Sequence, residues 1–127
     1  MRDLGLPAHI LATIYARRLE VNVSPELFAE YVHVLNRPRL KIPAPKVDQL
    51  LNWYRAHARW VQAPEAINIC SDPSDDMVLA CAIRGQVDFL VTGNTTDFPQ
   101  QWEKISVVTP RQFVGEPRCK AIFASPL

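Results

Sequence analysis

The sequence predicts an α/β domain in which helices flank a parallel sheet. Segments with apolar residues at helical spacing alternate along the chain with short extended segments, and this alternation is typical of parallel sheets covered on both faces. The chain has 127 residues, of which 48% are hydrophobic. It therefore has room for one domain with one apolar core, and its composition is not that of a disordered chain.

In the first half of the chain, helix-start signals and apolar spacing define the expected elements. Ser24 and Pro25 are typical of a helix N-terminus, because serine accepts hydrogen bonds from free N–H groups and proline fits the first turn. We expect, in order, a helix over residues 7–18, a strand over 19–23, a helix over 24–36, a helix from 45 to 58 and a short strand at 60–61.

The second half continues the same alternation. We expect a helix over residues 72–85, a buried strand over 87–92, a strand over 105–108 and a short helix over 109–113. Residues 1–114 are predicted to form the domain, and residues 115–127 a mobile C-terminal tail.

Composition excludes several classes of function. The formal net charge is +1, so strong binding to nucleic acid must come from a local patch. No stretch approaches the roughly 20 apolar residues of a membrane span, and we expect no membrane association. The three cysteines have no metal spacing and Cys81 lies in an apolar run, which favours a reduced, cytoplasmic setting.

The acidic start of the fourth predicted helix is the most informative feature of the sequence. Asp76 is followed at once by an almost wholly apolar run, where a carboxylate is costly unless it binds a cation or hydrogen-bond donors. The alternative is an acidic residue favoured by the helix dipole. Asp72, before Pro73, is either a helix cap or a metal ligand, and Asp75 is solvated or part of the cap.

Other oxygen-bearing side chains could complete a metal site. Glu30 lies beside an apolar stripe, either at the rim of a cleft or exposed on its helix. Asn94 and Asp97 follow the end of a predicted strand, where α/β folds place their sites, although turn chemistry explains them equally well. Carboxylates that hold Mg²⁺ or Mn²⁺ can activate water and stabilise charge on a phosphodiester.

A local basic patch follows the second predicted helix. It contains Arg37, Arg39, Lys41 and Lys46. Such residues can contact RNA phosphates, and the alternative is a solvated loop.

The order of these motifs resembles the PIN-domain family, in particular the group of toxin components of toxin–antitoxin systems. The similar segments are residues 23–31, 72–80, 88–99 and 107–113, within a region from about Gly5 to Phe113. The resemblance implies a three-layer α/β fold with a parallel sheet. It also implies a metal-dependent endoribonuclease, the toxin of a type II pair, with RNA and an antitoxin protein as partners.

The resemblance also assigns roles to individual residues. It implies Glu30, Asp76 and Asp97 as catalytic residues, with Asp97 partly replacing an acid that the family often has at Asn94. The implied ligands of Mg²⁺ or Mn²⁺ are Asp76, Glu30, Asn94 and Asp72. Contacts to RNA are expected from Arg37, Arg39 and Lys41.

The family's first strand, the central one, ends in Asp-Thr-Asn and has no counterpart before the first helix of this sequence. We therefore expect a fold without that strand, with open edges at residues 19–23 and 87–92. Either these two edges close on each other, or a second copy of the chain fills the gap, and we expect a homodimer. A catalytically impaired remnant that binds RNA or an antitoxin without cleaving is the alternative. A small-ligand α/β enzyme with an apolar pocket is a third reading.

Overall fold

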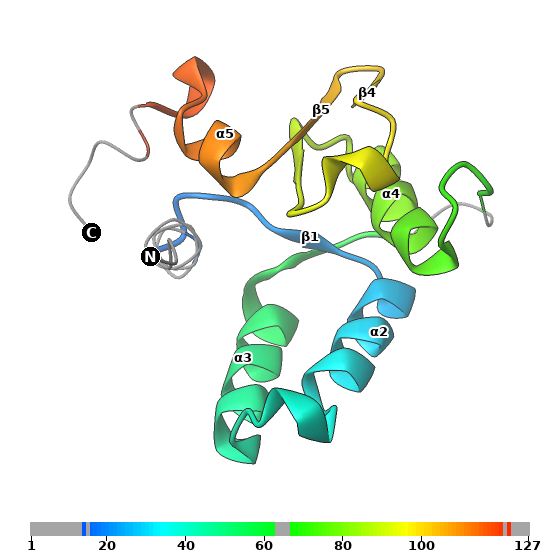
Figure 1. The fold of residues 1–127 in the computed structure, drawn as a ribbon. Helices are drawn as coiled ribbons and strands as arrows, with labels where there is room; N and C mark the ends of the chain where they lie inside the picture. Colours follow the sequence, from blue (N-terminus) through cyan, green and yellow to red (C-terminus); the bar gives the residue numbers. More distant parts are fainter. Residues whose placement is uncertain (1–13, 15, 63–66, 121, 123–127) are drawn as a thin grey trace. The chain divides into compact units, whose positions relative to one another are not determined.

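A computed structural model of the chain describes residues 14, 16–62, 67–120 and 122 (Figure 1). The chain divides into two compact units: unit 1 is Met1–Glu20 with Gln86–Leu127, and unit 2 is Val21–Gly85. Of the helix expected over residues 7–18, residues 7–13 and 15 lie outside the described residues, whereas residues 16–18 are not helical, because Arg17 adopts a left-handed backbone conformation with φ at 62°.

Unit 2 is built on a parallel pair of very short strands with a helical hairpin between them. Strand β1 (Asn22–Val23) pairs with β2 (Arg59–Trp60), so that Val23 lies opposite Trp60. Between the strands the chain forms α2 (Pro25–Leu35), the 3₁₀ helix η1 (Pro38–Leu40) and α3 (Ala44–His57). Figure 1 shows α2 and α3 running away from the strands to the turn that contains η1. The strand expected over residues 19–23 is shortened to its last two residues.

The start of α2 follows from the local sequence. Ser24 is 1% exposed and its hydroxyl accepts a hydrogen bond from the Leu27 amide at 3.2 Å. Pro25, which has no N–H to leave unpaired, occupies the first turn. The expected cap is thus confirmed, and it is buried.

Helix α4 (Pro73–Gly85) completes unit 2 by packing against α2 and β1. Leu79 is fully buried, and Cys81 is 3% exposed, as its apolar surroundings predict. One buried cluster joins β1, α2, α3 and α4, and it consists of Val23, Leu27, Phe28, Val47, Leu51, Val61 and Cys81. The apolar stripes predicted for these helices therefore share a single core.

Unit 1 contains a three-stranded sheet of order β3-β5-β4. Strand β3 (Phe89–Val91) pairs in parallel with β5 (Ile105–Val108), and β4 (Gln101–Trp102) pairs antiparallel with β5. Helix α5 (Pro110–Val114) follows β5 directly and begins with a capping box between Thr109 and Gln112. The sequence did not predict β4, which is only two residues long.

The chain of unit 1 continues past the predicted end of the domain. The 3₁₀ helix η3 (Pro117–Cys119) follows α5, and Cys119 is 5% exposed against Phe113. The Arg118 guanidinium carbon lies 4.4 Å from the centre of the Phe89 ring. The segment η3 therefore packs against α5 and the sheet, while the mobility expected from residue 115 onward stays a prediction.

The α/β fold class is confirmed by helices combined with parallel strand pairs. Among the described residues β1 pairs only with β2, and β3 pairs only with β5 and lies at the edge of its sheet. The absence of a central strand remains a prediction. None of the helices in the described ranges has the length and apolar character needed to cross a membrane.

Candidate active site

Asp76 is a buried carboxylate in the first turn of α4. Its side chain is 8% exposed, and its Oδ1 atom accepts hydrogen bonds from the amides of Cys70 at 2.8 Å and Ile69 at 3.1 Å. The Cys70 amide is the main cause that holds the pKa of Asp76 below its ordinary value, against an opposing effect of burial. Asp76 is therefore ionised at neutral pH, and backbone donors stabilise its charge.

This arrangement resolves one of the alternatives drawn from the sequence. A carboxylate beside an apolar helix needs a cation or donors, and the donors are the two amides of the segment before α4 together with the thiol of Cys70. Both amide bonds use the Oδ1 atom. The second carboxylate oxygen, Oδ2, is the atom through which Asp76 could also contact a cation.

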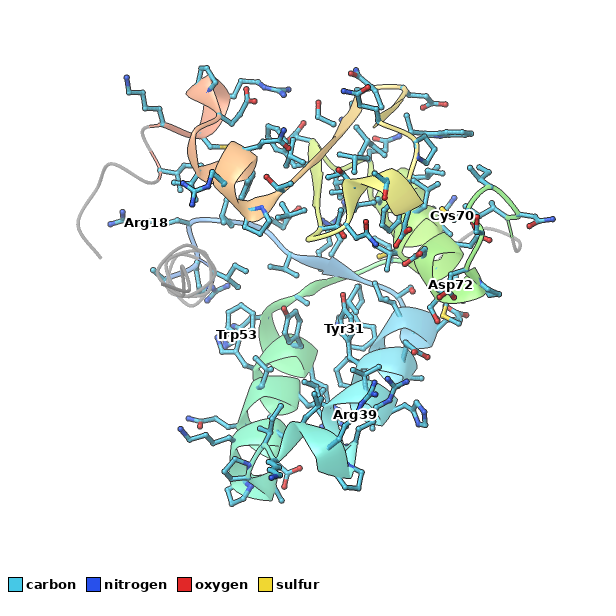
Figure 2. All side chains as sticks on the ribbon, in the orientation of Figure 1. Arg18, Tyr31, Arg39, Trp53, Cys70 and Asp72 are labelled. Carbon is cyan, nitrogen blue, oxygen red and sulfur yellow. The ribbon has the colours of Figure 1, made fainter. Side chains whose placement is uncertain are left out.

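Asp72 lies just before α4 and acts on the backbone of the helix start. Its Oδ1 atom accepts a hydrogen bond from the Ser74 amide at 2.8 Å, and the side chain is exposed. Figure 2 shows Cys70 and Asp72 close to the start of α4. The geometry matches the capping alternative, while a metal role for Asp72 stays a prediction. Asp75 is half-buried on the same turn, and its amide donates to the Asp72 carbonyl at 3.0 Å.

Glu30 is half-buried on α2, the helix that packs against α4. Its placement depends on the buried start of α2, where the Ser24 hydroxyl also hydrogen-bonds the thiol of Cys81 on α4. Burial is the main cause that raises the pKa of this thiol. Glu30 and Asp76 thus belong to two helices that share one core within unit 2.

Asn94 and Asp97 lie in unit 1, in the loop that follows β3. The Asn94 amide nitrogen Nδ2 donates to Asp97 Oδ2 at 2.7 Å, and Thr96 Oγ1 donates to Asn94 Oδ1 at 2.8 Å. The Asn94 backbone amide donates to Thr92 Oγ1 at 3.2 Å. Asp97 ends the 3₁₀ helix η2 (Thr95–Asp97), and both side chains are exposed. The turn chemistry expected here is present, and it brings these two predicted ligands together.

The donor set suits a hard divalent cation in kind, because it consists of carboxylate and amide oxygens, one of which belongs to a carboxylate held ionised. Within neither unit do the described residues gather three or more histidine, cysteine, aspartate or glutamate side chains around one position. The structure therefore pairs Asn94 with Asp97 in unit 1, and places Glu30, Asp72 and Asp76 on α2 and the start of α4 in unit 2.

The basic patch lies around η1, at the turn of the helical hairpin. Arg39 and Lys41 are exposed and Arg37 is half-buried. Lys41 adopts a left-handed backbone conformation, with φ at 53°, and ends η1. Figure 2 shows Arg39 toward this end of the hairpin. The three predicted RNA contacts therefore share one exposed turn with Leu40 and Ile42, which are 42% and 39% exposed.

Two features of the site left no signal in the sequence pattern. The amides of Ile69 and Cys70 are backbone groups, which every residue except proline possesses, so only folding identifies them as donors to Asp76. Thr92 and Thr96 support the Asn94 loop through hydroxyl groups that are common in any turn.

A family model described as "PIN domain" matches residues 2–96, well over half of the chain. No curated protein and no solved structure shows a significant match.

Proposed function

Because this chain belongs to the PIN-domain family, we propose that it is a metal-dependent endoribonuclease. Membership of the family supports a nuclease, a hydrolase of phosphodiester bonds, and favours RNA as the bound nucleic acid. Within the structure, the observation that carries the proposal is the buried, ionised Asp76 at the start of α4. A carboxylate kept ionised out of bulk water is a strong cation ligand.

Within unit 2, the residues that would hold Mg²⁺ or Mn²⁺ are Asp76 and Glu30, with Asp72 as a further oxygen donor. Asn94 of unit 1 is a ligand that only the resemblance to the family implies. A bound divalent cation supplies an activated water and stabilises negative charge on the scissile phosphate. The chain itself contributes the orientation of Asp76, because two amide bonds to Oδ1 fix its carboxylate before any ligand arrives. The paired Asn94 and Asp97 side chains likewise hold each other in place.

The test is cleavage of a labelled single-stranded RNA in the presence of Mn²⁺ or Mg²⁺. We expect Asp76→Asn to reduce the rate by on the order of a hundredfold or more, because a metal ion lowers such barriers by several kcal/mol. Asparagine keeps an oxygen that can accept the Ile69 and Cys70 amides, whereas alanine would leave them without a partner. Loss of rate in the asparagine variant therefore reports chemistry rather than unfolding.

Glu26→Gln is the matched control, since it also removes one charge from the first turn of a helix in unit 2, at an exposed position outside the proposed ligand set. We expect this variant to keep most of the activity, and we expect EDTA to abolish cleavage by the unaltered protein. Cleavage that survives both Asp76→Asn and EDTA would show that the site is wrongly assigned.

A second candidate function is a remnant that binds RNA or an antitoxin protein without cleaving. Two observations favour it. Asn94 carries a neutral amide at a position where the PIN-domain family often has an acid, and the Oδ1 atom of Asp76 already accepts hydrogen bonds from backbone amides. Calorimetric titration with Mn²⁺ separates the two functions. A nuclease takes up the metal specifically and loses that uptake in Asp76→Asn, whereas a remnant shows no specific uptake in either protein.

We also propose that the chain acts in the cytoplasm as the toxin of a toxin–antitoxin pair and forms a homodimer. The support is the resemblance of residues 23–31, 72–80 and 88–99 to that group, together with the β3 edge that carries no partner strand in the described part of the chain. Sedimentation of the purified protein tests the dimer. Growth arrest on expression, lost in Asp76→Asn, tests the toxin role.

A further inference from the structure

The helical hairpin and β2 carry a concentration of positive charge that the chain as a whole does not have. Residues 37–59 contain six lysines and arginines and one acidic residue, Asp48, in a protein whose net charge is +1. The six are Arg37, Arg39, Lys41, Lys46, Arg55 and Arg59, and all but Arg37 are exposed. The rest of the chain is therefore net negative, and this segment is where a polyanion would be attracted.

An exposed tryptophan lies at the strand end of this basic segment. Trp60 in β2 is 40% exposed, although tryptophan is usually well buried. Its ring packs against Phe28 with centroids 5.2 Å apart, and its indole Nε1 donates to the Arg55 carbonyl at 3.3 Å. The ring is therefore held in one orientation on its inner side while much of its surface remains accessible.

Arg55 contacts the same Phe28 ring as this tryptophan, and Arg59 precedes the tryptophan in β2. The Arg55 guanidinium lies 5.0 Å from the centre of the same Phe28 ring, and its Nη1 atom donates to Asn52 Oδ1 at 2.8 Å. Arg59 is fixed by bonds to Asn22 Oδ1 at 3.2 Å and to the Gly85 carbonyl at 2.8 Å. In the described ranges neither guanidinium is paired with a carboxylate, so both charges are left for an external anion.

We propose that Trp60 and Arg55 form a base-stacking site for unpaired RNA. A fixed aromatic face beside guanidinium groups is the surface on which extruded bases stack, and any base can stack there because every base has a π-face. Arg55 and Arg59 would take the adjoining phosphates. This inference rests on the proposed function, because it names single-stranded RNA as the class of substrate and adds a specificity-determining residue.

The length of α3 also sets how long an RNA strand must be to reach both ends of this basic segment. Helix α3 is about 20 Å long, and it separates Trp60 and Arg55 from the basic patch around η1. An RNA strand that contacts both ends must therefore be several unpaired nucleotides long. A duplex offers no free base to Trp60, so it would engage the phosphate-binding residues alone.

The experiment measures binding of a fluorescently labelled single-stranded oligonucleotide by anisotropy, in EDTA so that no cleavage occurs. We expect Trp60→Ala to weaken binding about tenfold, in line with the effect of removing one stacking residue. Trp60→Phe keeps an aromatic face and should stay within about twofold of the unaltered protein. Circular dichroism of both variants checks that the fold is kept. If the alanine variant unfolds, a roughly tenfold loss of binding in a folded Trp60→Phe, which keeps the aromatic face, would still overturn the proposal.

Lys46→Ala, which removes an exposed cation in the first turn of α3, is the control. It should reduce the dependence of affinity on salt by about one unit of slope, whereas Trp60→Ala should leave that slope unchanged. Equal loss of duplex and single-stranded binding in Trp60→Ala would overturn the proposal, and so would unchanged single-stranded binding in both Trp60 variants. Binding of an acidic polypeptide that depends on Trp60, with no such dependence for RNA, would also overturn the proposal and indicate a protein partner.

These outcomes are separable from the test of the proposed function. RNA binding that is insensitive to Trp60, combined with metal-dependent cleavage that Asp76→Asn abolishes, removes the stacking site and leaves the nuclease. Binding that depends on Trp60 without any cleavage supports the stacking site and favours the remnant.

Discussion

Ser24→Ala should destabilise unit 2 through the start of α2. The hydroxyl of Ser24 is buried and has two partners, the Leu27 amide and the Cys81 thiol. Loss of a helix cap costs about 0.5–2 kcal/mol, and loss of the weak bond that the hydroxyl donates to the Cys81 sulfur adds less than an ordinary hydrogen bond. We therefore expect the free energy of unfolding to fall by about 1–2 kcal/mol.

Urea unfolding followed by circular dichroism measures this change. With a denaturant dependence of about 1–3 kcal/mol per molar urea, the midpoint should fall by roughly 0.5–1.5 M. The slope of the transition should not change, because the substitution does not alter the surface exposed on unfolding.

Ser24→Gly is the control that isolates the cap. Glycine at a cap position costs only a few tenths of a kcal/mol relative to serine, yet it removes the hydroxyl bond to Cys81 just as alanine does. We expect the glycine variant to unfold at a higher urea concentration than the alanine variant. A midpoint for Ser24→Ala equal to that of the unaltered protein would refute the reasoning.

Two other predictions concern α4. The folded pKa of Asp76 lies below its ordinary value of 3.8, so its charge stabilises the fold above that pH, and the contribution is lost as the pH falls through the folded pKa. The difference in unfolding free energy between the unaltered protein and Asp76→Asn should therefore shrink between pH 7 and pH 3, and a constant difference in urea titrations would contradict it. Leu79→Ala, at a fully buried position, should cost about 2–5 kcal/mol. The exposed Ile69→Ala, which keeps the Ile69 amide, should change the urea midpoint little.

Local signals in the sequence predicted the long helices well. Ser24 with Pro25 and Asp72 with Pro73 mark the starts of α2 and α4 within a residue, because caps and prolines act on the nearest backbone groups. The spacing of Val47 and Leu51 likewise predicts the buried face of α3. These features depend on residues three or four positions apart, which is the range over which a sequence can be interpreted directly.

Short strands were harder to predict because pairing, rather than propensity, defines them. β1 keeps two of the five residues expected, where the backbone pairs with β2 across 37 positions of chain. β4 contains Gln101 and Trp102, which carry no strand pattern, and it exists because β5 offers a neighbouring edge. The segment after Gly115 was predicted to be mobile from its position in the chain. The structure adds contacts there that the sequence did not predict, namely Arg118 over the Phe89 ring and the burial of Cys119.

The sequence by itself determined the fold class, the family and the set of oxygen-bearing side chains that make Asp76 the leading candidate for catalysis. It could not decide how the charge of Asp76 is stabilised, because the Ile69 and Cys70 amides carry no side-chain signature. Nor could it show that Trp60 remains exposed beside Arg55, since exposure depends on what packs against each face. Such properties arise from contacts between distant segments, and only the tertiary structure specifies those contacts.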